Sequence, residues 1–295
     1  MNTEMAYLLG MIAGNGEIHR GDTETSISIE IPHKKLKTED FHDIALYVKA
    51  SISDIRNILE PLLGSDLCFI QNKAETIISF VKKNTEYIIR EILRYIGSAV
   101  SHNNMRVHED VFCFTNDEKK QFLRGFADVT GYIRRSNYFF DKYMHRVYLE
   151  VPHNWEMVID ICNILKDLDI PVQNIDWAHP NMRDGNAIKY NNGNYNFWKK
   201  EHQIKIWANE FLPIGFGVIH KQQALEMYSD ELISGLKRKN IDVEKKTHIF
   251  YWEGALKRKI KPNHPAENDS SLPNEIKGKH FDSWKEIAEE MGYGK

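Results

Sequence analysis

One apolar stretch that ends in glycine occurs twice in the chain, and this duplication constrains the fold more than any other feature. The stretch reads YLLGMIAGNG at 7–16 and FLRGFADVTG at 122–131. Each copy continues with Gly-x-Ile and later reaches an apolar–Glu–apolar–Pro–His run, which ends at His33 in one copy and at His153 in the other. A sequence unit that recurs with its parts in the same order predicts a duplicated structural unit.

The spacing of apolar residues predicts a helix and then a strand hairpin in each copy. Apolar residues three and four apart over 5–12 and 122–127 are typical of a buried helix face. Alternation over 26–31 and 146–151 is typical of a strand with one buried face. A middle helix and a later strand follow at matching places: 54–59 and 77–81 in one copy, 160–165 and 203–207 in the other.

The expected fold class is α+β, with two halves related by a pseudo-two-fold axis. The first half is predicted at 1–115 and the second at 116–228, followed by a basic C-terminal extension with a short terminal helix at 229–295. Glycine recurs inside both first helices, as Gly10 and Gly125. A helical glycine costs roughly 0.5–1 kcal/mol relative to alanine, so a compensating contact is expected. We predict that these two helices approach each other closely; the alternative is a solitary buried helix with incidental glycines.

The two stretches resemble the motif of the LAGLIDADG homing endonuclease family, in its single-chain form with two motif copies. The nine matching residues are 8–16 and 123–131, and the resemblance covers roughly residues 1–225. It implies that the motif helices form the interface between the halves, and that each half lays a saddle-like antiparallel sheet over DNA. It also implies a monomer that binds double-stranded DNA and cleaves it with magnesium, as a homing or a restriction endonuclease.

The polar residues of the two hairpins are the candidate DNA contacts. A two-stranded ribbon fits the major groove, which carries an unambiguous donor and acceptor code. The candidates in the first half are His19, Arg20, Thr23, Thr25, Ser26 and Ser28. Those in the second half are Arg134, Arg135, Asn137, Tyr138, Lys142, His145 and Arg146. The alternative for each single residue is an ordinary solvated strand position.

The chain departs from the family at the positions that carry the chemistry. In active members the acid before the final glycine of each motif binds divalent metal, but here these positions hold Asn15 and Thr130. Magnesium prefers carboxylate oxygens. Asparagine offers a carbonyl oxygen without charge and threonine is a poor ligand, so most of the metal affinity should be lost.

Three interpretations remain open. In the first, the chain is an endonuclease that recruits other acids. In the second, it is a catalytically silent DNA-binding or regulatory protein with the same fold. In the third, Asn15 is an engineered change that traps a complex, but this does not explain Thr130. An RNA-binding splicing factor is a further class. The candidate catalytic residues are Asn15, Glu17, Asp128 and Thr130, with Lys82 and Lys205 as basic groups of the region that the family places near phosphates. Of these, Asn15, Glu17 and Asp128 are the candidate metal ligands.

Two further pairs occupy matching places in the duplicated strands. Glu30 and Glu150 are additional acids that a nuclease could recruit. His33 and His153 follow the matching prolines, and each is either a cap for the strand end or a phosphate contact or base.

The charge of the chain is unevenly distributed. The formal net charge is −3, which does not indicate a nucleic-acid-binding protein, but the segment 236–262 contains nine Lys or Arg and three acids. That segment is therefore +6 and the remainder −9. Basic residues near aromatic ones suit phosphate contact and stacking; the alternative is a solvated helix face. The candidate contacts here are Lys237, Arg238, Lys257 and Arg258.

Other classes of protein are disfavoured. The sequence has no apolar run of roughly 18 or more residues and no secretory pattern at its start, which predicts a cytoplasmic protein without a membrane partner. Cys68, Cys113 and Cys162 are dispersed in apolar contexts, which predicts buried reduced thiols rather than disulfides or a zinc site.

Overall fold

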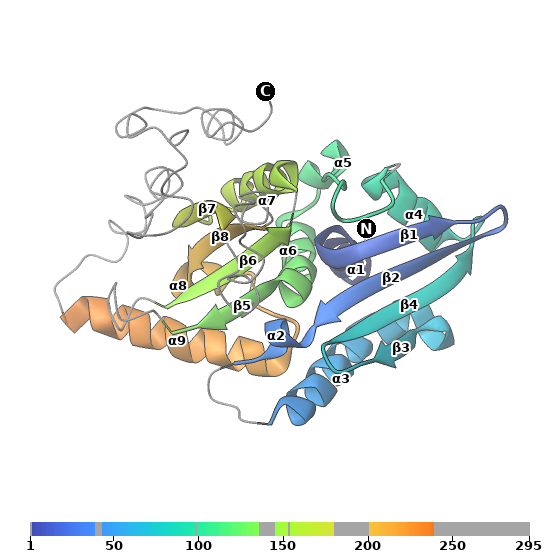
Figure 1. Cartoon of the computed structure of the whole chain (residues 1–295). Helices are drawn as coiled ribbons and strands as arrows, with labels where there is room; N and C mark the ends of the chain where they lie inside the picture. Colours follow the sequence, from blue (N-terminus) through green and yellow to red (C-terminus); the bar gives the residue numbers. More distant parts are fainter. Residues whose placement is uncertain are drawn as a thin grey trace, which may run out of the picture.

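Two four-stranded antiparallel sheets lie on either side of a central pair of helices in the computed structural model (Figure 1). The structure describes residues 2–38, 43–97, 99–135, 145–152, 154–179 and 201–238. In each half a motif helix is followed by two paired strands, a middle helix and two further paired strands, so the predicted α+β fold with two halves is confirmed.

The first sheet has the strand order β1-β2-β4-β3. Its half consists of α1 (Thr3–Asn15), β1 (Gly16–Arg20), β2 (Glu24–Pro32), α2 (His33–Leu36), α3 (Ile44–Leu63), the 3-10 turn η1 (Gly64–Asp66), β3 (Cys68–Gln71), β4 (Glu75–Lys83) and α4 (Tyr87–Ile96).

The second sheet has the corresponding order β5-β6-β8-β7. Its half consists of α6 (Asn116–Thr130), β5 (Gly131–Arg134), β6 (Arg146–Pro152), α7 (Trp155–Asp167), β7 (Asn174–His179), β8 (Glu201–Trp207), α8 (Ala208–Phe211) and α9 (Ile219–Arg238), and the short helix α5 (Glu109–Phe112) precedes it in the connection from α4. The predicted middle helices at 54–59 and 160–165 thus lie within α3 and α7, and the later strands within β4 and β8.

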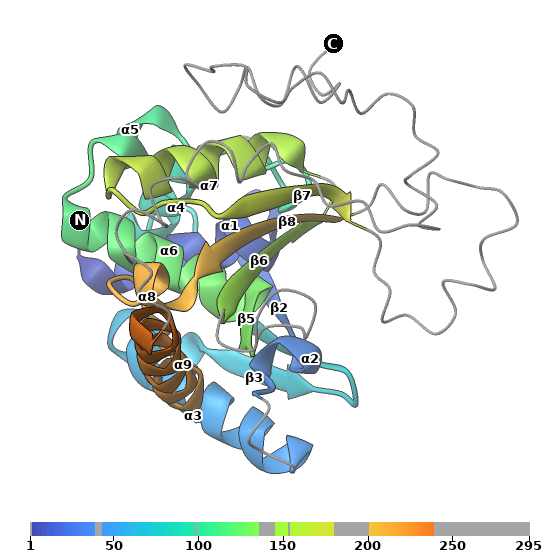
Figure 2. The same cartoon turned by 90° about the vertical axis from the view of Figure 1, so that its left-hand side faces the viewer.

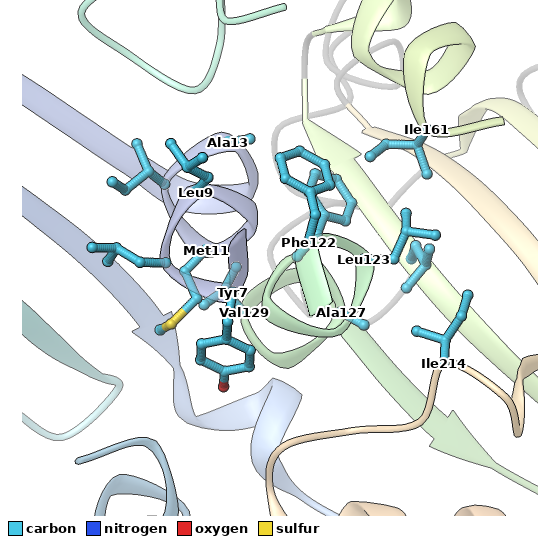
Figure 3. Packing of buried hydrophobic residues seen from close by; sticks show 14 of the residues in the cluster. Tyr7, Leu9, Met11, Ala13, Phe122, Leu123, Ala127, Val129, Ile161 and Ile214 are labelled. Atoms are coloured by element: carbon cyan, nitrogen blue, oxygen red, sulfur yellow. The ribbon is translucent and has the colours of Figure 1, made fainter. Parts of the chain in front are cut away.

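The two motif helices, α1 and α6, pack against each other at their backbones. A Cβ atom on Gly10 would lie 1.8 Å from the carbonyl oxygen of Phe122, and one on Gly125 would lie 2.0 Å from that of Tyr7. No side chain larger than glycine fits at either position. The predicted close approach of the two helices is confirmed, and Figure 3 shows them side by side within the shared apolar core.

Each sheet buries one face against helices. In β2 the residues Ile27, Ile29 and Ile31 are fully buried, whereas the alternate residues are half-buried or exposed. In β6 the inner positions are Val147 and Leu149, also fully buried. We call the side of each sheet that points away from these helices its outer face. The period of two that the sequence predicted therefore places polar hairpin residues on the outer face.

Helix α9 joins the second half to the first. It contacts β5 and α8 of its own half and also α3, beside which it lies in Figure 2. The backbone N–H of Ile219 donates to Asp54 of α3 at 2.9 Å, and Nε2 of His220 lies 2.7 Å from the carbonyl oxygen of Leu36. Since α9 continues to Arg238, the predicted boundary after residue 228 falls inside a helix.

Two sequence expectations need correction or cannot be placed. Cys162 is buried as predicted, but Cys68 and Cys113 are exposed, because one lies on the edge strand β3 and the other just after the short helix α5. All three thiols are free.

The candidates Asn137, Tyr138, Lys142, His153, Lys257 and Arg258 lie outside the described residues. None of the described helices has the length and apolar character needed to cross a membrane.

Candidate nucleic-acid interface

The motif helices end at Asn15 and Thr130, and both side chains bond to the backbone of their own half. Asn15 Nδ2 donates to the carbonyl oxygen of Glu30 at 2.7 Å, which ties the end of α1 to β2. Thr130 is 4% exposed, and its hydroxyl donates to the carbonyl oxygen of Phe126 at 2.7 Å. The two positions therefore support the local packing of the helix ends.

Asp128 lies inside the packing between helices, loop and α9. Its side chain is fully buried; it accepts hydrogen bonds from the Tyr7 hydroxyl at 2.7 Å and from the Gly217 N–H at 2.8 Å. Val218 N–H is a further donor at 3.5 Å, and Lys221 Nζ lies 3.8 Å away. Burial raises the pKa of Asp128, although the charge of Lys221 opposes this effect. Its carboxylate thus contacts protein groups on several sides.

Lys221 binds the carbonyl groups at the C-terminal end of α6. It is fully buried, and its ammonium group donates to the carbonyl oxygens of Ala127 at 3.2 Å and Gly131 at 3.0 Å. Burial lowers the pKa of Lys221 to about 8, against the opposing effect of Asp128. A buried lysine beside helix carbonyls and a carboxylate is a structural arrangement.

Carboxylates gather on the outer face of the first sheet, near the end of α1. The Glu17 side chain is 51% exposed, and its Oε2 lies 3.8 Å from His19 Nε2. Partial burial raises the pKa of Glu30 to about 7, with further contributions from its hydrogen bond to Glu75 and from the charges of Glu75 and Glu17. Lys34 acts in the opposite direction. This cluster gives the sheet a locally acidic surface.

The residues at the helix ends do not fit a magnesium site of the two-acid kind. Magnesium requires near-octahedral oxygen ligands and favours carboxylates. Asn15 and Thr130 supply an amide and a hydroxyl that already bond to backbone carbonyls, and Asp128 is enclosed. Within the part of the chain that the structure describes, no group of three or more His, Cys, Asp or Glu is arranged to hold a metal ion. No metal-dependent step follows from these residues.

The first sheet brings together some of its predicted DNA contacts and separates others. Glu17 pairs with Ser28 and His19 with Ser26, so all four share the outer face. Thr25 is 1% exposed on the inner face, where its hydroxyl donates to Asn84 at 2.7 Å. Arg20 donates to the carbonyl oxygen of Gly97. A hollow of about 490 Å³ lies at this edge of the sheet, lined by Glu17, Ile18, His19, Arg20, Val100 and Ser101.

The outer face of the second sheet carries cations stacked with aromatic rings. The strand register places two rows across it: Arg134 beside Arg146 and Trp207, and Tyr132 beside Tyr148 and Lys205. We call these six residues the cation–ring ladder. The two tyrosine rings are stacked, with centroids 5.0 Å apart and an interplanar angle of 6°. Sequence reasoning missed the three aromatic residues, although they share the strand parity of the predicted arginines.

The cations of the ladder lie over ring faces. The Arg134 guanidinium carbon is 4.7 Å from the Tyr148 ring centroid, and that of Arg146 is 4.5 Å from the Trp207 ring centroid. Lys205 Nζ lies 5.8 Å from the Tyr148 ring centroid. Cation–π contacts of this geometry hold the positive groups in fixed positions. Arg134 and Lys205 remain half-buried, whereas Arg146 and the rings are buried.

The remaining predicted residues lie away from the ladder. Lys82 points to the inner side of the first sheet, at 2.5 Å from Asp66 and 3.6 Å from Glu86, and the hydrogen bond to Asp66 raises the pKa of Lys82. Lys82 therefore lies on the inner face of the first sheet, whereas Lys205 lies on the outer face of the second sheet.

Three further predicted residues have partners within the protein; His145 and His33 are buried, whereas Arg135 is exposed. His145 is fully buried, with Nε2 2.8 Å from Glu231 of α9, and Arg135 lies 3.5 Å from the same carboxylate. Nε2 of His33 lies 2.9 Å from the hydroxyl of Thr76, near the start of β4. Lys237 and Arg238 lie at the end of α9, and their side chains lie outside the described part of the chain.

No family model and no curated protein matches the chain. Among solved structures, I-DmoI in complex with DNA and Ca is similar with a TM-score of 0.39 and 14% identity, over 72% of this chain and 86% of that chain. Full-length DUF199/WhiA from Thermatoga maritima is similar with a TM-score of 0.44 and 15% identity, over 85% of this chain and 66% of that chain. The LAGLIDADG homing endonuclease I-GzeII in complex with its DNA target is similar with a TM-score of 0.43 and 9% identity, over 84% of this chain and 96% of that chain. Likeness at this level does not assign the chain to a family.

Proposed function

We propose that the chain is a sequence-specific double-stranded DNA-binding protein that acts as a monomer, with the outer faces of both sheets against one duplex. The observation that carries this proposal is the cation–ring ladder of the second sheet. Two sequence copies of one motif and two sheets of corresponding strand order on a closely packed helix pair support it further. A single chain therefore has two outer faces, and both can lie against the same duplex.

The chemistry of the ladder suits a duplex. Lysine and arginine neutralise phosphates and release condensed counterions, and arginine can also bond guanine with two parallel hydrogen bonds. Arg134 and Lys205 are the half-buried cations of the ladder and are the proposed phosphate or base contacts. On the first sheet His19, Ser26 and Ser28 are the proposed contacts, since they share the outer face. Thr25 and Lys82 are omitted because they point inward.

We further propose that the protein does not cleave DNA by the two-acid metal mechanism. The support is the chemistry of Asn15 and Thr130, which bond to backbone carbonyls, and the enclosure of Asp128. The proposed role is therefore recognition or regulation.

Selection from a random duplex library tests DNA recognition. We expect one sequence family to be enriched, and binding to the enriched duplex to weaken steeply with salt because phosphate contacts release counterions. Arg134→Gln and Lys205→Gln should each lower the affinity, whereas Lys49→Gln on the exposed side of α3 should leave it unchanged. Absence of enrichment together with a flat salt response would contradict the proposal.

A second candidate function is a nuclease that uses relocated acids. The observation in its favour is the position of Glu17 and Glu30 beside the end of α1. Incubation of the enriched duplex with and without magnesium separates the two functions. Cleavage that requires magnesium and is lost in the Glu17→Gln/Glu30→Gln double variant would establish the second candidate; an intact duplex under both conditions supports the first.

A further inference from the structure

A lysine of the first half is buried against the second sheet. Lys35 lies in α2, the four-residue helix that follows β2, and its side chain is 7% exposed. It donates to Oε2 of Glu150 on β6, whose side chain is 15% exposed. Lys35 Nζ also lies 5.2 Å from the centroid of the Tyr132 ring on β5. One short helix of the first half thus reaches two strands of the second.

The second sheet is organised to receive this charge. Gln203 Nε2 donates to Oε1 of Glu150 at 3.2 Å and to the Tyr132 hydroxyl at 3.0 Å. Glu150 therefore has a partner for each carboxylate oxygen, and Tyr132 is fixed further by stacking on Tyr148. A buried ion pair persists when the remaining polar atoms are also satisfied, as they are for this carboxylate.

Among the described residues, Glu30 of the first half makes no counterpart of this contact. Glu30 occupies the place that matches Glu150, but its carboxyl group bonds to Glu75 of its own sheet. Within the described residues, no cation of the second half forms an ion pair with Glu30. The contact is therefore one-sided, and a duplicated sequence alone does not generate it.

We propose that Lys35 and Glu150 form a latch that fixes the spacing of the two sheets, so that the protein accepts a duplex whose two half-sites have one defined separation. The latch lies where α2 contacts both α6 and β5, and thus close to the junction of the halves. A buried pair with fixed hydrogen-bond partners resists sliding because any displacement leaves a charge without its partner. This inference rests on the proposed DNA-binding function, and Lys35 acts in it as a positioning residue.

The latch is tested by the tolerance of the protein for altered spacing. The variants are Lys35→Met and Glu150→Gln, with exposed Lys37→Met as the matched control. The probes are the enriched duplex and the same duplex with one base pair inserted at its centre. We expect the two latch variants to bind the original duplex about tenfold more weakly and to lose less affinity on insertion than the natural protein does.

A readout without DNA keeps the two proposals separate. Hydrogen exchange of the free protein should accelerate in α2 and β5 of both latch variants, and the exchanged-charge variant Lys35→Glu/Glu150→Lys should partly restore protection. Unchanged exchange and unchanged discrimination between the duplexes would overturn the latch. If the natural protein binds no duplex, the proposed function fails, and the exchange data alone decide whether Lys35 holds the halves together.

Discussion

Single residues decide the chemistry of this fold. Asn15 and Thr130 occupy helix ends that the motif resemblance marks for acids, and each side chain bonds to a nearby backbone carbonyl. Asp128, the acid that remains in the second motif, is buried with Tyr7 and Lys221. The resemblance to the motif drew attention to these positions. The sequence could not predict the burial of Asp128, because Lys221 lies on a helix far along the chain.

Removal of the Asp128 charge should strongly destabilise the protein. Asp128→Asn leaves the Lys221 ammonium buried without its carboxylate, and removal of one member of such a pair costs about 3–5 kcal/mol. Urea unfolding measures the loss. Asp117→Asn in the first turn of the same helix is the control, since its side chain is 87% exposed, and it should change stability by less than about 0.5 kcal/mol. A small effect of Asp128→Asn would show that Lys221 finds other compensation.

Glu30 should make stability and DNA binding depend on pH. Its pKa of about 7 in the folded protein exceeds the ordinary value of 4.5, so the folded state holds the proton more tightly. The tighter binding of this proton stabilises the folded state; the stabilisation is complete below about pH 4.5 and is lost as the pH rises through 7. The natural protein should therefore lose stability relative to Glu30→Gln between about pH 5 and 8, as measured by unfolding at each pH. DNA affinity should fall in the same window, since a charged Glu30 joins Glu17 on the outer face.

The control for this pH effect is Glu24→Gln, an exposed position on the same strand. It should leave the pH profile unchanged. A Glu30→Gln protein with the same profile as the natural one would contradict the assignment of the titration to Glu30.

At the scale of helices and strands, the sequence was most informative where periodicity and glycine placement agreed. The motif helices, the hairpins and the contact at Gly10 and Gly125 follow from local patterns. The cation–ring ladder was missed because it depends on register: Tyr148 shares a face with Lys205 through a strand pairing of distant segments. Lys35 gave no signal, since the lysine of a short helix is ordinarily solvated.

The helix contact predicts a severe effect of a single methyl group. In Gly10→Ala the new Cβ would meet the carbonyl oxygen of Phe122, a backbone atom that moves only if the two helices separate. We expect a loss of about 3 kcal/mol in unfolding free energy, despite the higher helix propensity of alanine. Exposed Asn57→Ala on α3 reports the propensity gain alone and should stabilise by a few tenths of a kcal/mol. A neutral Gly10→Ala variant would contradict the close approach.

For the whole molecule, charge is distributed between a body that is net negative and a basic segment at 236–262. On the outer faces of the two sheets, the second carries the cations of the cation–ring ladder, whereas the first carries acids near the end of α1. Affinity for DNA should therefore draw on the basic segment as well. Its contribution follows from charge alone and does not depend on the conformation of that segment.

Neutralising the basic segment should flatten the salt response. Each neutralised phosphate contributes about 0.9 to the slope of log affinity against log salt, so Lys257→Gln/Arg258→Gln should reduce the slope by about 1.8. Titration of the enriched duplex at several salt concentrations measures it. Lys49→Gln/Lys73→Gln, a pair of exposed residues on the body, serves as the control with the same loss of charge. An unchanged slope would exclude these two residues from phosphate contact.

The return of α9 to the first half has a consequence for how the halves stay together. Ile219 and His220 hold α3 and α2, while α1 and α6 share a backbone contact, so the halves are joined by packing as well as by the peptide that links them. A chain interrupted between α4 and α5 should therefore behave as two complementary fragments. When the two fragments are expressed together, they should reassemble into one particle. The interrupted protein would then be a heterodimer of its two halves.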